Sequence, residues 1–324
     1  MVVTIHDKTV NFVTDPKFGK SPSSRSIPEL LDLGIINLDK PANPTSHEVS
    51  AWVKQIVGVN KAGHGGTLDP AVTGCLPIAL GSATRALSVL LLAGKEYICI
   101  MKTHKPVSSE KLLSVLEHFR GKIYQTPPVR SSVKRRLRVR KIYELELIEY
   151  DESSLFLLRI KCEAGTYIRK LCFDIGLLLG TGAHMQELRR TRTGPFSEDT
   201  CVTLQDLSDA WYYYKHEGNE TLIREIIRPI EEICSDIPKI YIRDSAVDAI
   251  CHGAALTIPG VLRVSNRIDK NSTIAIFTLK EELVAFAQST MTTKEILDST
   301  NGICAKPHPV FMIKKTYPSS WKKK

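Results

Sequence analysis

Hydrophobic and polar residues along this chain follow both helical and strand-like spacings. From Val49, apolar side chains recur at i, i+3, i+4 and i+7, which predicts an amphipathic helix over residues 46–57. Similar spacing predicts further helices at residues 112–119, 167–179, 204–215 and 222–233. Short apolar runs predict strands at residues 35–38, 97–101, 143–148 and 155–162. Because strands and helices are mixed without a regular β-α-β alternation, the pattern favours an α+β fold over a doubly wound sheet.

Polar segments and proline residues between the predicted elements indicate how the chain is divided into domains. Residues 1–30 are polar and interrupted by proline and serine, which is typical of an arm without its own core. A boundary is predicted near Pro238, after which short strands and helices indicate a small second domain. We therefore expect a large domain at residues 31–236, a small domain at 237–318 and a basic tail at 319–324.

Composition and charge exclude some classes of protein and favour others. The 324 residues are 43% hydrophobic and 24% charged, which excludes wholesale disorder. The strongest apolar stretch, residues 86–94, is far shorter than the roughly 20 residues that a membrane-spanning helix needs. A net charge of +9 favours polyanionic partners. The eight cysteines are far apart and form no CxxC pair, which argues against a zinc site and predicts reduced thiols in a cytoplasmic protein.

Residues 63–70, which read Gly-His-Gly-Gly-Thr-Leu-Asp-Pro, carry the strongest chemical signal. Asp69 is the only acidic residue between Lys61 and Lys95. A carboxylate among glycines and apolar residues loses solvation and needs a cation to remain ionised. The segment taken alone also fits a turn anchored by Asp-Pro. It lacks the spacing of a phosphate-binding loop.

The longer string at residues 62–77 resembles the catalytic motif of pseudouridine synthases. It is most similar to the branch that contains the bacterial TΨC-arm tRNA synthase and the dyskerin-type H/ACA enzymes of archaea and eukaryotes. Further motifs of this family match in the same order at residues 95–97, 127–134, 165–169 and 182–190. Ordered matches over roughly 130 residues are more specific than any single motif. The resemblance implies a catalytic domain with a mixed, largely antiparallel central sheet.

The resemblance also implies roles for individual residues. Asp69 would be the nucleophile that attacks either C1′ of the ribose or C6 of the uracil, and Arg169 would keep it charged in a site that excludes water. Tyr97 would stack on the flipped base. No metal or organic cofactor is implied. Three further residues are implied to contact the substrate: His64, Tyr167 and Leu188.

These residue types also allow plainer interpretations. Without the motif, Tyr97 and Tyr167 would more often be core aromatic residues. Arg169 could be a solvated charge on a helix. His64 could be no more than a hydrogen-bonding residue of its loop.

Clusters of basic residues favour an RNA substrate. Six of the eight residues at 134–141 are basic, which would neutralise phosphates and make binding strongly salt-dependent, although a solvated hairpin flank is also compatible. These residues are Lys134, Arg135, Arg136, Arg138, Arg140 and Lys141. A second pair, Arg189 and Arg190, follows Leu188 closely enough to flank the same cleft.

Residues 244–254, with Pro259 and Gly260 after them, resemble a PUA domain, a small β-rich RNA-binding domain. The resemblance implies that His252, Gly253 and Ala254 approach nucleotides at the ACA end of a guide RNA. Gly253 is also compatible with a simple helix stop.

The spacing between motifs separates the branches of the family. The insertions usual in stand-alone tRNA enzymes are missing after the Tyr97 strand and after Lys134, which favours the guide-dependent, dyskerin-type branch. The lack of long lysine-rich tails of the nuclear kind favours the archaeal form of that branch. The implied partners are an H/ACA guide RNA, substrate rRNA or tRNA, a kink-turn-binding ribosomal-type protein, a small zinc-ribbon-like protein and a Gar-type protein. A stand-alone tRNA pseudouridine synthase and a non-catalytic RNA-binding scaffold are the alternatives.

Overall fold

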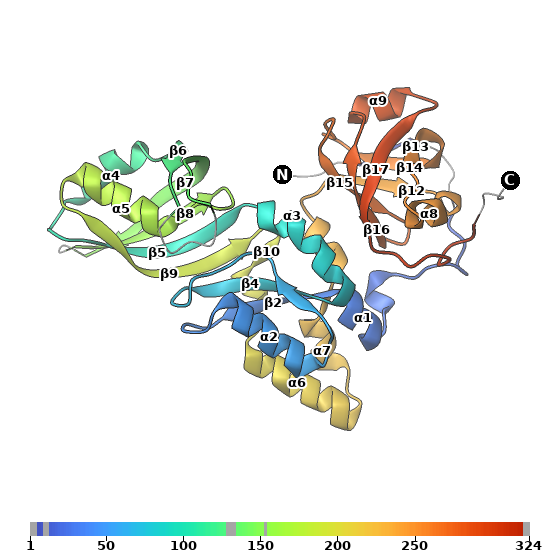
Figure 1. The fold of residues 1–324 in the computed structure, drawn as a ribbon, viewed down its shortest axis with the longest axis horizontal. Helices are drawn as coiled ribbons and strands as arrows, with labels where there is room; N and C mark the ends of the chain where they lie inside the picture. The colour runs from blue at the N-terminus through green and yellow to red at the C-terminus, as the bar shows by residue number, and fades with distance from the viewer. Residues whose placement is uncertain (1–4, 9–12, 128–133, 152–153, 320–324) are drawn as a thin grey trace.

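The structure of the chain is a computed structural model that describes residues 5–8, 13–127, 134–151 and 154–319. Two β-sheets organise it (Figure 1), a ten-stranded sheet in the N-terminal two thirds and a seven-stranded sheet near the C-terminus. Helices and strands are mixed in both parts, and the predicted α+β class is confirmed.

The larger sheet runs in the order β11-β2-β4-β9-β5-β8-β7-β6. Its described pairings are antiparallel, except that β4 and β9 run parallel. The strands are β2 (Gly34–Lys40), β4 (Thr73–Leu80), β5 (Lys95–Thr103), β6 (Gly121–Gln125), β7 (Arg138–Tyr150), β8 (Leu155–Cys162), β9 (Ala183–Thr193) and β11 (Arg228–Pro229). Short β3 (Ala62–His64) pairs with β4, and β10 (Phe196–Ser197) pairs with β9.

Helices pack against this sheet around separate hydrophobic cores. One core lies under α4 (Ser109–Glu117) and α5 (Ile168–Leu179), at the green and yellow end in Figure 1. The other lies under α1 (Ile27–Leu33), α2 (Ser46–Val57), α6 (Leu204–Glu217) and α7 (Thr221–Ile226). The short helix α3 (Leu87–Leu92) precedes β5.

The helix predicted at residues 222–233 is wrong in its second half. Helix α7 ends at Ile226, and the chain continues as β11 and a 3-10 turn. Pro229 explains the break, because proline lacks the N–H that a continuing helix needs.

The smaller sheet runs in the order β1-β14-β12-β15-β16-β17-β13 and is covered by α8 (Asp244–Cys251) and α9 (Thr293–Asp298). Its strands are β12 (Lys239–Ile242), β13 (Leu256–Thr257), β14 (Val261–Ser265), β15 (Thr273–Phe277), β16 (Leu283–Ser289) and β17 (Ile303–Val310). The edge strand β1 (Ile5–Asp7) comes from the N-terminal segment and pairs with β14. The polar N-terminus therefore contributes a strand to the C-terminal domain.

A third hydrophobic cluster joins the two sheets. It contains Ile35 and Ile230 from the larger part and Phe277 and Phe311 from the smaller part. Beside it, Arg25 and Glu231 form a buried ion pair at 2.6 Å. The two parts thus share this third cluster, in addition to the cores of their own.

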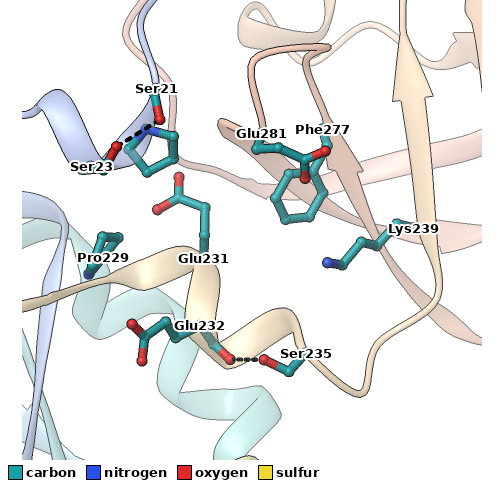
Figure 2. A pocket seen from close by; sticks show the side chains of 10 residues that line it. Ser21, Ser23, Pro229, Glu231, Glu232, Ser235, Lys239, Phe277 and Glu281 are labelled. Carbon is teal, nitrogen blue, oxygen red and sulfur yellow. Dashed lines mark hydrogen bonds between the residues drawn. The ribbon is translucent and has the colours of Figure 1, made fainter. Parts of the chain in front are cut away.

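A pocket of about 380 Å³ lies at this junction (Figure 2). Its lining comes from the N-terminal segment, the end of the larger domain and the smaller sheet: Ser21, Pro22, Ser23, Pro229, Glu231, Glu232, Ser235, Lys239, Phe277 and Glu281. The acidic side chains already have partners, since Glu231 binds Arg25, Glu232 binds Arg228 and Glu281 accepts a hydrogen bond from Tyr241. The pocket contains none of the predicted site residues.

Candidate active site

The structure brings Asp69 and Arg169 together in an ion pair. Asp69 lies in the loop between β3 and β4, and Arg169 is the second residue of α5. About half of each side chain is exposed, 52% for Asp69 and 48% for Arg169. The chain by itself therefore leaves the pair open to solvent, so the predicted exclusion of water is not provided by this chain alone.

Two buried polar residues hold the loop that carries Asp69. Lys40 is fully buried, and its Nζ donates to the carbonyl oxygens of Pro41 at 2.8 Å, Pro70 at 3.0 Å and Val72 at 2.9 Å. Burial and the charge of Arg190 lower the pKa of Lys40. The Oγ of Ser46 accepts from the N–H of Leu68 at 2.8 Å. These contacts fix the backbone on both sides of Asp69.

Sequence reasoning did not identify Lys40 or Ser46. The available signal was a lysine two residues after the apolar run 35–38, which predicts a short strand. A buried lysine must have its donors satisfied, and here backbone carbonyls satisfy them. That partnership depends on the tertiary fold.

Tyr97 lies on β5 and is 9% exposed, within the same hydrophobic core as Leu68 and Ile168. Leu68 and Ile168 are the sequence neighbours of Asp69 and Arg169, so the ion pair lies above the core that holds Tyr97. Burial raises the pKa of Tyr97, an effect that the Arg190 charge partly offsets. Leu188 on β9 pairs with Cys99 of β5 and packs against this core.

Tyr167 occupies the N-cap position of α5, and no side-chain hydrogen bond caps the helix there. The buried Gln125, at the end of β6, binds its backbone instead. Gln125 Nε2 donates to the carbonyl oxygen of Tyr167 at 3.1 Å, and the N–H of Tyr167 donates to Gln125 Oε1 at 2.9 Å. Sequence analysis missed Gln125, which fixes the start of the helix that carries Arg169.

We expect Gln125→Ala to lower the free energy of unfolding by about 1–3 kcal/mol, because two backbone groups of Tyr167 lose their partner. Urea unfolding of the full chain measures this effect. Gln205→Ala is the matched control, since Gln205 is exposed on α6 and donates to the exposed Asp209 of its own helix, and its loss should change stability by less than about 0.5 kcal/mol. Equal effects of the two variants would contradict the assignment.

His64 lies on β3, edge-on to His47 with ring centroids 4.9 Å apart. Its Nδ1 accepts from the N–H of Gly66 at 3.4 Å. Burial, and then the charges of His47 and Arg190, lower the pKa of His64 to about 4. His64 is therefore neutral at neutral pH and acts as a hydrogen-bonding residue of this loop.

This pKa predicts a loss of stability in acid. The pKa of His64 is lower in the folded chain than in the unfolded chain, so the unfolded chain binds more protons between pH 6.5 and about 4. The free energy of unfolding should therefore fall by about 2 kcal/mol from this residue as the pH falls from 7.5 to 5. Urea unfolding at both pH values measures this effect. The free energy of unfolding should fall less between pH 7.5 and 5 in His64→Gln than in wild type, by about 2 kcal/mol. The same difference in His64→Gln and wild type would argue against it, and His216→Gln, on exposed α6, is the control.

Arg189 and Arg190, which are both predicted to contact RNA, lie on opposite faces of β9 and have different surroundings. Successive side chains of a strand alternate between its two faces. Arg189 forms ion pairs with Asp39 at 2.9 Å and Glu198 at 2.8 Å. Arg190 is 1% exposed and donates to backbone carbonyls, so it cannot present its charge to RNA at the surface, and that prediction is wrong.

Models of known protein families match most of this chain. The TruB family pseudouridylate synthase N-terminal domain matches residues 54–111 and 100–168, and the tRNA pseudouridylate synthase B C-terminal domain matches residues 169–235. The PUA domain matches residues 238–311, and the DKCLD (NUC011) domain matches residues 5–50. A Methanosarcina barkeri protein named "Probable tRNA pseudouridine synthase B" is 54% identical over 96% of this chain and 92% of its own length. The chain belongs to the TruB family of pseudouridine synthases.

Solved structures place this pseudouridine synthase within the family. A chain of an H/ACA RNP bound to a substrate RNA containing 2′-deoxyuridine is 46% identical, with a TM-score of 0.94 over 99% of this chain and 98% of that one. A chain of a Cbf5-Nop10-Gar1 complex is 48% identical, with a TM-score of 0.94 over 98% and 97%. A Methanopyrus kandleri protein, also named "Probable tRNA pseudouridine synthase B", is 55% identical over 95% of this chain and 91% of its own length. The enzyme is a TruB-family protein of the dyskerin type.

The basic residues predicted to bind RNA lie before and along β7 of this pseudouridine synthase. Lys134, Arg135 and Arg136 are exposed, and Lys141 is exposed on the strand. Arg138 and Arg140 are half-buried, and Arg140 lies 3.6 Å from Glu163. Most of the matching motif at 127–134 falls outside the described residues, which end at Pro127 and resume at Lys134.

In the PUA domain, α8 ends at the predicted RNA-binding residues. His252 is the C-cap and its Nδ1 lies 2.8 Å from the carbonyl oxygen of Asp248. Gly253 has a φ of 85°, which favours glycine, and a Cβ there would meet no atom within 4 Å. The N–H of Ala254 donates to Ala249 at 3.0 Å. Gly253 therefore ends the helix, and the space beside its Cα is open.

Three remaining features concern the described ranges: the cysteines, the lengths of the helices and the possible metal ligands. Seven of the eight free cysteines are buried, and Cys201 is half-buried. No helix within these ranges is long and apolar enough to cross a membrane. Over the same ranges, no group of three or more His, Cys, Asp and Glu side chains is arranged to hold a metal ion.

Proposed function

We propose that this pseudouridine synthase is the catalytic subunit of an H/ACA ribonucleoprotein, which isomerises uridines in rRNA, and also in tRNA, at positions selected by a guide RNA. The observation that carries the proposal is the similarity, along almost the whole chain, to a chain of an H/ACA RNP bound to a substrate RNA. The similarity includes both the catalytic domain and the PUA domain, which is the part of the chain suited to hold a guide.

In the proposed reaction Asp69 is the nucleophile and attacks C1′ of the ribose or C6 of the uracil. Arg169 holds the carboxylate in its charged form and in one orientation. The N1–C1′ bond breaks, the base rotates, and a new bond forms between C5 and C1′. The bond to Asp69 then breaks, so the carboxylate is regenerated. The C5 proton leaves to water and N1 takes up a proton, so the product is an isomer of the substrate. The ring of Tyr97 stacks on the flipped base. The remaining contacts to the nucleotide come from His64, Tyr167 and Leu188.

The surfaces of the chain support two kinds of partner. The exposed basic residues before β7 suit the phosphates of guide and substrate RNA, and His252, Gly253 and Ala254 suit the ACA end of the guide. The complex would also include proteins of the Nop10, Gar1 and kink-turn-binding types. We place this assembly in the cytoplasm, in keeping with the free thiols of the chain.

Replacing Lys134, Arg135 and Arg136 together by glutamine should weaken binding of the guide RNA and flatten its salt dependence. Each phosphate contact contributes about 0.7–0.9 to the slope of log K against log salt, so the slope should fall by about 2–3. Filter binding at several salt concentrations measures it. An unchanged slope would remove these three residues from the RNA-binding surface.

A stand-alone tRNA pseudouridine synthase is the second candidate. It is favoured by the curated relatives, which are named tRNA pseudouridine synthase B. Such an enzyme would act on naked tRNA without a guide.

Tritium release from RNA containing [5-³H]uridine separates the two candidates. The chain is assayed with guide RNA and accessory proteins, and also alone on naked tRNA, each with Asp69→Asn in parallel. We expect Asp69-dependent release that requires the guide. Release from naked tRNA alone would move the protein to the stand-alone branch, and RNA binding without any release would leave an RNA-binding scaffold.

A further inference from the structure

Arg190 lies between the two strands that frame the candidate active site. Its strand, β9, is flanked by β4 and β5 in the sheet. The backbone of Arg190 is opposite Gly74 of β4 on one side and Tyr97 of β5 on the other. Strand β4 begins just after the Asp69 loop, so Arg190 occupies the junction between that loop and the Tyr97 strand.

The guanidinium group of Arg190 joins both ends of the Asp69 segment. Its Nε donates to the carbonyl oxygen of Cys75 at 2.8 Å, and its Nη2 donates to the carbonyl oxygen of Gly66 at 3.1 Å. Gly66 precedes Asp69 and Cys75 follows it. The planar guanidinium holds two separate acceptors at a fixed spacing, which the single nitrogen of a lysine cannot do.

Two glycines allow the backbone to approach Arg190 closely. Gly66 has a φ of 141° and Gly74 a φ of 101°, both in the region that favours glycine. A Cβ at Gly74 would lie 2.3 Å from the carbonyl oxygen of Arg190, so the two strands approach too closely for any other residue. The Asp69 segment thus packs directly against the β9 backbone at Gly74, and on the other side of the nucleophile Gly66 contacts the Arg190 guanidinium.

Burial of this charge is costly. Arg190 is 1% exposed, and none of the carboxylates in the described residues forms an ion pair with it. Lys40 and Lys95 are buried nearby and also donate to backbone carbonyls. Hydrophobic side chains usually fill such positions at lower cost than buried charges do. The cost indicates that the geometry imposed by the guanidinium is needed.

We infer that Arg190 is a positioning residue for the isomerisation, whose guanidinium holds the Asp69 loop at a fixed distance from the Tyr97 strand. Because its guanidinium is buried against the carbonyls of Gly66 and Cys75, it acts through the loop and not on the nucleotide. The inference rests on the roles proposed above for Asp69 and Tyr97. Loss of the hydrogen bonds from Arg190 to Gly66 and Cys75 lets the nucleophile depart from its productive position, while the RNA-binding surface stays intact.

The first test is the single-turnover rate of tritium release by the assembled complex carrying Arg190→Lys, which keeps the charge but loses one of the two bonds. We expect the rate to fall about 10–100-fold, with the dissociation constant for substrate RNA within about twofold of wild type. Arg224→Lys is the matched control, because Arg224 on α7 also donates to a backbone carbonyl, that of Arg25 at 2.8 Å. An unchanged rate, or a parallel loss of rate and RNA affinity, would overturn the inference.

Folding and chemistry are separated by a second measurement. Amide hydrogen exchange of the free Arg190→Lys chain should become faster at residues 67–75 and stay unchanged at residues 238–311. Unchanged exchange at residues 67–75 would overturn the inference even if the proposed guide-dependent activity fails. If Arg190→Lys does not fold, Arg190→Gln replaces it in both measurements, and failure of both variants to fold would make Arg190 a residue of the fold alone.

Discussion

Asp69→Asn should abolish pseudouridine formation and leave RNA binding intact. The substitution preserves the size of the side chain and its place in the loop held by Lys40 and Ser46. It replaces a carboxylate by an amide, which is not a nucleophile. We expect single-turnover tritium release to fall by about 10⁴ or more, the scale seen when an enzyme loses its nucleophile. Filter binding of substrate RNA should be unchanged.

Asp174→Asn is the control for this experiment. Asp174 is an aspartate of α5 that forms an ion pair with Lys170, the residue after Arg169. Its replacement should leave the rate within about twofold, because this half-buried pair lies outside the Asp69–Arg169 contact. If Asp69→Asn kept a tenth of the wild-type rate, a different residue would have to be the nucleophile.

Arg169→Met should lower the rate of isomerisation about 100-fold or more, with little change in stability. The guanidinium is the only ion-pair partner of Asp69 found in the described residues, and it sets the orientation of that carboxylate. The pair is half exposed, so water screens it, and its loss should change the free energy of unfolding by no more than about 1 kcal/mol. Rate and stability are measured by tritium release and urea unfolding.

Arg169→Lys separates charge from geometry at the same position. It should retain more activity than Arg169→Met, because a cation remains, but less than wild type, because an ammonium group cannot reproduce the planar contact. Lys170→Met is the matched control on the next residue of α5 and should act like wild type. Loss of stability matching the loss of rate would show that the pair serves the fold.

Local patterns of the sequence predicted those parts of the fold that depend on local physics. The helix at residues 46–57 is α2, begun by the capping box of Thr45 and Glu48 and ended by Gly58 in the left-handed region. The strand at residues 155–162 is β8, with the same bounds. The ordered motifs also indicated the family, and the structure brings Asp69 and Arg169 into contact across 100 residues of chain.

Features that depend on distant partners could not be predicted this way. Arg190 looks like a surface charge in the sequence, but the register of β9 turns it inward, towards Gly66 and Cys75. The polar N-terminus carries no strand signal, yet β1 pairs with β14, because an edge strand needs backbone partners rather than apolar side chains. Lys40 and Gln125 are visible as polar residues, and only the fold shows that they hold the Asp69 loop and the start of α5.

The most direct test of guide-dependent catalysis is to change the guide. The chain is assembled with accessory proteins, a guide RNA and a substrate RNA, and the modified position is mapped by primer extension after pseudouridine-specific chemical labelling. Altering the guide so that it pairs around a second uridine should move the pseudouridine to that uridine, and Asp69→Asn should leave both sites unmodified. Modification that stays at the same uridine whatever the guide would contradict the account.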